Sequence, residues 1–500
     1  MGIKASLSKP FAAWVSAQVK AQHQNPVERQ MLLMKSLVSQ AKETKFGRDH
    51  HFASISSHHD FVKQVPVNDY EGLKPYIEKI KQGEENILWK GKPIYFAKTS
   101  GTTSGVKYIP ITKDSMPNHI NSARNALLLY IHETKKAAFT EGKMIFLQGS
   151  PELSDMHGIK VGRLSGLVYH HVPGYLLKNR LPSYQTNCID DWETKVETIC
   201  QETLHENMTL ISGIPPWVLM YFEKLLEQSG KEKVKDVFKN FSLFVYGGVN
   251  YEPYRAKIEN LVGKKIDSIE TYPASEGFIA YQDNQNDEGL LLNVDSGIFF
   301  EFIPASEVFN ENPTRITLAE VEMGVNYALI INSNAGLWGY NIGDTIKFVS
   351  KNPHRIVVTG RIKHFISAFG EHVIGEEVEF ALLKAAEELG CNIIEFTVAP
   401  QVTPSNEELP YHEWFIEFET IPSDLPKFSS AIDRHLQAKN IYYKDLIAGK
   451  ILQPLKIAVI NNNGFREYMK SKGKLGGQNK VARLSNDRII ANELQPWVQR

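Results

Sequence analysis

The sequence predicts an α/β protein in which a large N-terminal domain of α/β sheet layers and a small antiparallel β-barrel precede a small, mobile α+β C-terminal domain. Three observations predict this class. The 500 residues are too many for a single core. Strand-like and helix-like segments alternate between residues 143 and 277, which is typical of a parallel sheet covered by helices. From Gly289 onward, strand-like segments follow one another without helices, which indicates an antiparallel sheet or barrel.

The N-terminal half begins with helices and continues with alternating elements. Apolar residues recur at helical spacing in the first eighty residues, as in residues 26–50. Four short apolar strands are expected at residues 143–150, 208–214, 241–248 and 266–277. Helices are expected at residues 215–230 and 251–263, between the last three of these strands. In parallel sheets ligands bind beyond the carboxyl ends of the strands, so a site is expected at these strand ends.

The C-terminal half contains two kinds of segment. Consecutive strands are expected at residues 289–303, 314–322, 327–334, 344–350 and 355–361. A helix at 376–389, strands at 392–400 and 411–420, and a helix at 428–439 then form an α+β unit of ordinary domain size. The predicted domains are residues 1–362, with the barrel at about 289–360, and residues 363–500.

Composition and charge exclude several classes of function. Lys plus Arg (56) nearly equals Asp plus Glu (57), so the chain offers no strong field to nucleic acid or to an anionic membrane, and its partners are expected to be small molecules. Three cysteines lie far apart, which argues against a disulfide framework or a zinc site and favours a reducing cytoplasm. The N-terminus lacks the long apolar stretch of a signal peptide, and no apolar run is long enough to span a membrane. Residues 1–6 match the myristoylation pattern MGxxxS only loosely. No obligate protein partner is evident.

The segment between Phe96 and Thr112 is crowded with small hydroxylated residues and glycines. Its central members are Thr99, Ser100, Gly101, Thr102, Thr103, Ser104 and Gly105. Such a loop offers backbone N–H groups and hydroxyls to an anion, and Lys107 adds a cation. It is not a Walker P-loop, because the lysine is displaced and no hydroxyl follows it. Taken alone, a run of Ser, Thr and Gly is more often an ordinary loop.

Two later segments supply carboxylates. The strand end that contains Tyr272 and Ser275 places Glu276 where a carboxylate could hold Mg²⁺ that bridges phosphates, with a plain turn as the alternative. Asp344 follows a glycine turn and could accept hydrogen bonds from ribose hydroxyls, although turns of this kind are common. Both segments are compatible with a nucleotide site.

Basic residues in the last third of the chain are further candidates. Arg361 and Lys363 lie at the predicted domain junction. Lys480 follows the Gly-rich stretch of residues 475–478. For all three, a solvated surface charge is the alternative interpretation.

Four segments, in this order, resemble the motifs of the adenylate-forming enzymes: TSGTTSGVKYIP, YPASE, YNIGD and GRIKHFISAFGEHVIGEEVE. This superfamily contains acyl-CoA ligases, peptide-synthetase adenylation domains and firefly luciferase. Within it, the hydroxylated TSGTTSG loop, the IPPW segment and the chain length resemble the plant auxin- and jasmonate-conjugating acyl acid amido synthetases and their bacterial relatives. The resemblance extends from about Phe96 to Arg483 and implies the adenylate-forming fold.

The resemblance implies that ATP and a carboxylic acid react to an acyl-adenylate and pyrophosphate. The amine of an amino acid then attacks the acyl carbon and releases AMP. The implied ligands are ATP and Mg²⁺, and the implied nucleotide-binding residues are Thr99 to Gly105, Gly247, Gly248, Tyr272, Ser275, Asp344 and Arg361. In the family, the loop holds the β- and γ-phosphates, the glycine pair lies against adenine, the tyrosine flanks the base, and the aspartate binds the ribose with help from the arginine.

The implied catalytic residues are Lys107, Glu276 and Lys480. By resemblance, Lys107 holds the departing pyrophosphate, Glu276 binds Mg²⁺, and Lys480 touches the carboxylate and the α-phosphate. Lys363 occupies the hinge position about which the small domain rotates between the two half-reactions. No other metal is expected.

The acyl pocket is expected to be lined by Tyr130, Val168, Tyr169 and His170, although plain core packing is the alternative for such residues. The identities of the acid and of the amine depend on pocket shape and are left open. Two other functions share the same motifs: an acyl-CoA ligase with a thiol acceptor, and a nucleotide-binding regulator without turnover.

The chain departs from luciferase-like members at Ser367, where those enzymes carry a lysine. The residue that serves the second half-reaction is therefore open. Glu371 and His372, in the same segment, are candidates.

Overall fold

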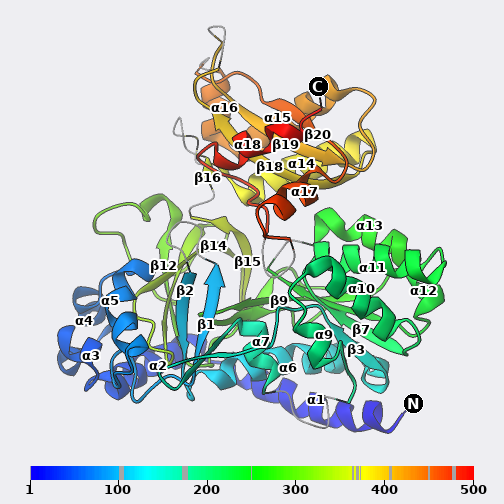
Figure 1. Cartoon of the computed structure of the whole chain (residues 1–500). Helices are drawn as coiled ribbons and strands as arrows, with labels where there is room; N and C mark the ends of the chain where they lie inside the picture. Colours follow the sequence, from blue (N-terminus) through cyan, green and yellow to red (C-terminus); the bar gives the residue numbers. More distant parts are fainter. Residues whose placement is uncertain are drawn as a thin grey trace. The chain divides into compact units, whose positions relative to one another are not determined.

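The computed structural model describes residues 2–100, 106–171, 178–248, 251–362, 365–366, 371, 373–404, 408–448, 451–475 and 480–499. The chain forms two compact units (Figure 1). The first holds residues 1–342 and 346–357, and the second holds residues 343–345 and 358–500. The domain boundary after residue 362 stays a prediction.

Helices fill the first eighty residues, as predicted. They are α1 (Ile3–Gln22), α2 (Pro26–Ala41), α3 (Lys45–Asp49), α4 (His58–Gln64) and α5 (Tyr70–Lys81). Ser57 and Asp60 exchange side-chain and backbone hydrogen bonds at the start of α4, which is a capping box. Asp69 caps α5 by accepting a hydrogen bond of 3.2 Å from the Gly72 N–H. These caps fix where each helix begins.

One eleven-stranded sheet dominates the first unit. Its strands, in spatial order, are β12 (Ile298–Pro304), β13 (Asn326–Ser333), β14 (Tyr340–Lys351), β15 (His354–Arg361), β11 (Leu290–Leu292), β10 (Gly277–Tyr281), β9 (Asp267–Ala274), β8 (Leu243–Gly247), β7 (Met208–Ser212), β3 (Lys143–Phe146) and β6 (Arg180–Leu181).

The strands β3, β7, β8 and β9 are parallel. Helix α11 (Pro215–Ser229) connects β7 to β8, and α13 (Glu252–Val262) connects β8 to β9. Figure 1 shows α11 and α13, with α10 (Trp192–Thr203), on one side of these strands and α6 (Met116–Thr134) on the other. The predicted strand and helix alternation is confirmed. Because the strands run in one direction, β8 and β9 end at the same edge of the sheet.

The strands after residue 289 continue the same sheet. Strand β10 runs antiparallel to β9, and β11 runs antiparallel to both β10 and β15. The sheet therefore changes from parallel to antiparallel at β9 and β10. The strand predicted at residues 314–322 is wrong, apart from a bridge between Ile316 and Phe302. The Glu320 carboxylate accepts a 2.9 Å hydrogen bond from the Thr317 N–H. This bond forms a local turn in place of the predicted strand.

A second sheet in this unit has the order β2–β1–β5–β4, with β1 (Tyr95–Ser100), β2 (Val106–Ile111), β4 (Ser154–Met156) and β5 (Ile159–Gly162). Short helices α7 (Leu164–Tyr169), α9 (Tyr184–Asn187) and α12 (Val234–Val237) lie in the connections. Helix α6 follows β2 directly and packs against β9 and β10, with α1 along it. The chain thus passes from the small sheet straight to the large one.

The second unit is α+β, as predicted. Its sheet has the order β18–β19–β20, with β18 (Ile393–Gln401), β19 (Tyr411–Phe418) and β20 (Lys456–Ile460). Its helices are α14 (Gly375–Leu389), α15 (Leu425–Lys439), α16 (Ile441–Ala448), α17 (Gly464–Ser471) and α18 (Ile489–Leu494), and β16 (Phe365–Ile366) pairs with β17 (Val373–Ile374). Trp414, Phe428 and Leu436 are buried in its core. Among the described residues of the whole chain, no helix has the length and hydropathy needed to cross a bilayer.

A buried ion pair between Glu301 and Arg315 lies at the β12 edge of the large sheet, and His58 of α4 contacts it. Glu301 on β12 is fully buried, and Arg315 donates to it through Nε at 3.1 Å and through Nη2 at 2.6 Å. His58 Nε2 lies 2.9 Å from Glu301 Oε1, and Asn332 donates to Oε2 at 2.8 Å. Burial acts to raise the pKa of Glu301, but the Arg315 cation and these hydrogen bonds outweigh it and lower the pKa to about 2.

Candidate active site

The ends of β8 and β9 bring together two of the predicted segments. Gly247 ends β8 and pairs with Thr271 of β9. A Cβ on Gly247 would lie 2.4 Å from the Thr271 carbonyl oxygen, so only glycine fits this close approach. Gly248 follows with a positive φ of 75° and is exposed. Tyr272 is buried beside them on β9, with 7% of its surface exposed.

Ser275 and Glu276 form the two-residue turn between β9 and β10, with Ala274 paired to Gly277 at its base. Both turn residues are half-buried. No group of three His, Cys, Asp or Glu residues suited to a metal occurs among the described residues. The donor set at this turn is a single hard oxygen ligand. Such a set fits Mg²⁺, which keeps several waters and is usually held by one or two carboxylates and substrate phosphates.

The described residues of the hydroxylated segment lie on the paired strands β1 and β2. Thr99 pairs with Lys107, and Ser100 pairs with Val106. Gly101, Thr102, Thr103, Ser104 and Gly105 lie outside the described residues. Lys107 is half-buried, with Nζ 5.6 Å from the centroid of the Tyr70 ring. Lys107, the predicted cation, therefore lies on β2, one residue pair before the end of the described part of the two strands.

The predicted basic and acidic residues of the second unit also come together. Arg361 Nε lies 2.9 Å from Asp344 Oδ1. Part of the Lys480 side chain is exposed, yet loss of hydration around its ammonium lowers the pKa of this group to about 8. The charge of Asp344 acts to raise this pKa, and the charge of Arg361 acts to lower it. Three residues from distant parts of the sequence thus share one electrostatic environment. Lys363 lies outside the described residues.

The structure brings together three of the four residues predicted to line the acyl pocket. Val168 and Tyr169 end α7, and His170 follows, with its Nε2 2.9 Å from the Pro151 carbonyl oxygen. The Arg180 guanidinium lies 4.2 Å from the centroid of the Tyr169 ring. Whether these residues line a pocket stays a prediction.

The structure does not bring Tyr130 together with the other three residues. Its hydroxyl donates a 2.6 Å hydrogen bond to Asp267, the first residue of β9. This is the opposite end of the strand from Tyr272 and Glu276. Position 130 lies near the end of α6, which runs past the whole length of β9, and sequence alone does not show this distance.

Glu371, a candidate for the second half-reaction, is buried. His412 Nε2 lies 2.9 Å from Glu371 Oε1, and neither side chain is exposed. This geometry makes Glu371 part of a buried hydrogen-bonded pair within the second unit. His372 lies outside the described residues.

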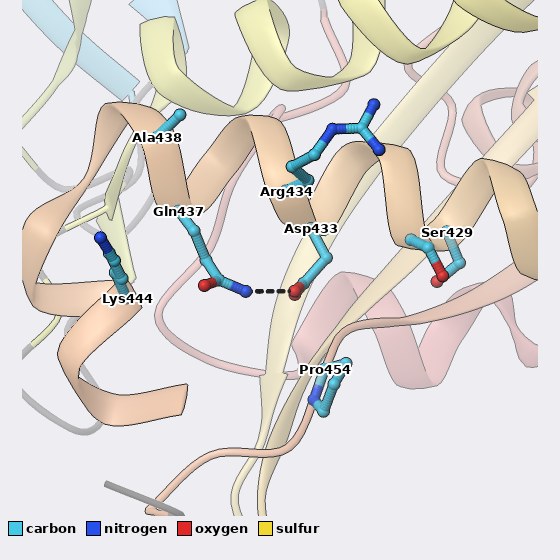
Figure 2. Close-up of a pocket in the computed structure, with 8 residues that line it drawn as sticks. Ser429, Asp433, Arg434, Gln437, Ala438, Lys444 and Pro454 are labelled. Atoms are coloured by element: carbon cyan, nitrogen blue, oxygen red, sulfur yellow. Dashed lines mark hydrogen bonds between the residues drawn. The ribbon is translucent and has the colours of Figure 1, made fainter. Parts of the chain in front are cut away.

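A separate pocket of ≈ 400 Å³ lies in the second unit, beside α15 and α16 (Figure 2). Its buried acid, Asp433, accepts hydrogen bonds from Gln437 at 2.6 Å and from the Tyr443 hydroxyl at 2.7 Å. None of the residues predicted for the site lines this pocket. It adds no group to the chemistry of the candidate site.

Asn118 is absent from every sequence motif, yet it contacts β10 next to the Glu276 turn. Its side chain is buried and forms hydrogen bonds with the N–H and with the carbonyl oxygen of Phe278. A polar residue at a buried position of a helix is the only sequence signal that could have pointed to it.

Three parts of the chain match one family. Residues 15–187 match the GH3 family N-terminal domain, residues 291–361 match the GH3 family central domain, and residues 376–489 match the GH3 family C-terminal domain. The chain belongs to the GH3 family. The three GH3 regions occur in the order expected and include β1, the YNIGD segment and the small C-terminal unit.

Known GH3 proteins resemble the chain over nearly its full length. Indole-3-acetic acid-amido synthetase GH3.3 of Arabidopsis thaliana is 22% identical over 93% of this chain and 92% of the relative. Jasmonoyl--L-amino acid synthetase GH3.5 of Oryza sativa subsp. japonica is 22% identical over 85% of this chain and 86% of the relative.

Solved structures share the fold. The GH3.15 acyl acid amido synthetase matches with a TM-score of 0.79 at 16% identity, over 98% of this chain and 97% of that chain. A 2-hydroxyisobutyryl-CoA ligase in the postadenylation state matches with a TM-score of 0.59 at 13% identity, over 95% of this chain and 92% of that chain. The predicted fold, that of the adenylate-forming ligases, is therefore confirmed.

Proposed function

We propose that this GH3 protein is an ATP-dependent acyl acid amido synthetase. It activates a small carboxylic acid as an acyl-adenylate with release of pyrophosphate. It then transfers the acyl group to the amine of an amino acid with release of AMP. The family match over all three domain regions carries this proposal.

The two half-reactions follow from the chemistry of the substrates. A carboxylate is a poor electrophile, because its negative charge repels nucleophiles. One carboxylate oxygen forms a bond to the α-phosphorus of ATP, and the bond from that phosphorus to the bridging oxygen of pyrophosphate breaks. The amine nitrogen then bonds to the acyl carbon, the carbon–oxygen bond to AMP breaks, and the nitrogen loses a proton. Charge develops on phosphate oxygens, so the site needs donors and cations more than a protein nucleophile.

In this proposal, residues of the β1–β2 hairpin bind the phosphates, and residues at the ends of β8 and β9 bind the base. The loop of residues 99–105 and Lys107 bind the β- and γ-phosphates and then pyrophosphate. Gly247 and Gly248 lie against the adenine, Tyr272 flanks it, and Ser275 is a further nucleotide-binding residue. The close packing of Gly247 on β9 and the position of Tyr272 on the adjacent strand support this assignment.

Glu276 is the proposed metal ligand. When bound, Mg²⁺ neutralises the phosphate charge and withdraws electrons from the reacting phosphorus. The place of Glu276 in a tight turn at the carboxyl edge of the sheet supports this role.

The second unit supplies the remaining proposed groups. Asp344 accepts hydrogen bonds from the ribose hydroxyls, and Arg361 assists it. Lys480 contacts the carboxylate and the α-phosphate. The 2.9 Å contact between Arg361 and Asp344, and the electrostatic link of both to Lys480, support this grouping. The cysteines are free among the described residues, which fits the proposed cytoplasmic location.

The alternative is an acyl-CoA ligase, which shares the first half-reaction and uses a thiol acceptor. The fold alone does not choose between the two acceptors, because both kinds of enzyme have it. A panel of carboxylic acids tested by ATP–pyrophosphate exchange identifies the acid, and mass spectrometry of products with amino acids or CoA identifies the acceptor. We expect exchange with some acids and amide products. Products with CoA only would overturn the amide assignment, and the absence of exchange with every acid would favour a nucleotide-binding regulator.

The hinge proposed at Lys363 gives a separate expectation. Lys363→Pro should spare ATP–pyrophosphate exchange and block amide formation, because proline restricts the backbone rotation that the second half-reaction needs. Both rates are measured on one preparation of the variant, together with its melting temperature. An equal loss of both half-reactions would contradict the hinge role.

A further inference from the structure

The backbone of Phe278 lies where strand β10 lacks a neighbour. On one side, β11 pairs with β10 only at Ala280 and Tyr281. Phe278 and Pro273 of β9 form a non-hydrogen-bonded pair, because Pro273 has no N–H, so the N–H and the carbonyl of Phe278 point to the side that β11 leaves open. Phe278 is buried, so its N–H and carbonyl groups need partners other than water.

The carboxamide of Asn118 supplies those partners. Its Oδ1 accepts a 2.7 Å hydrogen bond from the Phe278 N–H, and its Nδ2 donates to the Phe278 carbonyl oxygen at 3.2 Å. Nδ2 also donates to the Ser296 hydroxyl at 3.0 Å. One side-chain amide therefore takes the place of a peptide group of the missing strand.

A second asparagine completes the arrangement. Asn293 Nδ2 donates to the same Phe278 carbonyl oxygen at 3.2 Å and to the Ser122 hydroxyl at 2.6 Å. The Asn293 N–H donates to the Ile279 carbonyl oxygen at 2.9 Å. Helix α6, through Asn118 and Ser122, is thus bonded to β10 at its first residues.

This contact lies two residues beyond the Glu276 turn. The register of β9 and β10 shifts between Phe278 and Ala280, which is an irregularity of the kind that re-aims side chains next to active sites. Because Ala280 is opposite Tyr272, the shift also sets the position of the turn relative to Tyr272.

We propose that Asn118 is a positioning residue that aims the Glu276 carboxylate at the metal by holding the Phe278 peptide groups. This inference rests on the proposed function, in which Glu276 binds Mg²⁺. Asn118 touches neither metal nor substrate in this role. Its loss leaves the buried Phe278 N–H without this partner, leaves the Phe278 carbonyl oxygen with Asn293 as its side-chain donor, and frees the register of the turn.

The test compares Asn118→Ala with Gln30→Ala. Gln30 is a matched control, because its buried carboxamide also accepts from one backbone N–H, that of Phe300 at 2.8 Å, and donates to two backbone carbonyl oxygens, at 2.7 Å and 2.9 Å. Binding of Mn²⁺ in the presence of a non-hydrolysable ATP analogue is followed by the EPR signal of free Mn²⁺. Amide hydrogen exchange of peptides that cover residues 271–281 is measured in parallel.

We expect Asn118→Ala to weaken Mn²⁺ binding by about 10-fold and to speed exchange at Phe278, while Gln30→Ala changes neither. Asn118→Asp keeps the acceptor for the Phe278 N–H but loses both donors, and we expect an intermediate effect. It serves as the folded variant if the alanine protein is unstable. Equal Mn²⁺ affinity of the Asn118 and Gln30 variants would overturn the positioning role.

Glu276→Gln separates this inference from the proposed function. Weak Mn²⁺ binding by Glu276→Gln together with normal binding by Asn118→Ala would overturn only the role of Asn118. Normal binding by Glu276→Gln would overturn the metal role of Glu276, and the inference with it.

Discussion

Replacing Glu276 with glutamine should lower ATP–pyrophosphate exchange by about 100- to 1,000-fold, as expected when charge stabilisation at a transition state is removed. Glutamine keeps the size of the side chain in the turn between β9 and β10 but removes the negative charge that attracts Mg²⁺. Glu276→Ala should abolish exchange. The measurement is the exchange rate at saturating acid, titrated with Mg²⁺.

Glu288→Gln is the control for this experiment, because Glu288 is an exposed acid in the connection after β10. It should leave the exchange rate and its dependence on Mg²⁺ unchanged. Exchange by Glu276→Gln at the rate of the unaltered protein would show that another group holds the metal.

Replacing Arg315 with methionine should lower the free energy of unfolding by about 3–5 kcal/mol, because it leaves the Glu301 carboxylate buried without its cation. Arg315 donates two hydrogen bonds to Glu301, and the exposed fractions of the two side chains are 3% and 0%. Urea denaturation of the variant and of the unaltered protein, followed by circular dichroism, measures the difference for the first cooperative transition.

The double variant Glu301→Leu with Arg315→Met is the control. It removes both charges, so most of the lost stability should return. A double variant as unstable as Arg315→Met alone would show that lost packing, rather than an unpaired charge, causes the effect.

The stability that the Glu301 pair contributes should also depend on pH. The pKa of Glu301 is lowered from 4.5 to about 2 in the folded protein, so folding favours the ionised form. The contribution is fully present above the unfolded pKa of 4.5 and is lost as the pH falls toward 2. Urea midpoints measured between pH 6 and pH 3 should fall more steeply for the unaltered protein than for the double variant.

Much of the fold can be predicted from the sequence because its long elements carry strong local signals. The predicted helices at 215–230 and 376–389 lie within a residue of α11 and α14. These helices have apolar residues at helical spacing and glycine just beyond their ends. The strand predicted at 314–322 fails because alternation alone does not reveal that the Glu320 side chain bonds the Thr317 backbone.

The site is less predictable than the fold. Motif spacing and resemblance predict Glu276 and Asp344 as site residues, because turns at strand ends leave a recognisable pattern. Asn118 and Tyr130 show what spacing cannot provide. The role of Asn118 depends on where β11 stops and on a proline in β9, and the distance of Tyr130 from the site depends on the direction of α6. Both are properties of packing between segments more than 130 residues apart.

The hydrogen bond between His58 and Glu301 has a consequence for synthesis of the chain. The two residues are 243 positions apart. At about 5–20 residues per second, the ribosome needs roughly 12–50 s to make the segment between them. During this time the apolar faces of α2 and α4 have emerged, but the strands that cover them have not. Nascent chains should therefore bind holdase chaperones through these helices until Glu301 and the rest of β12 leave the exit tunnel.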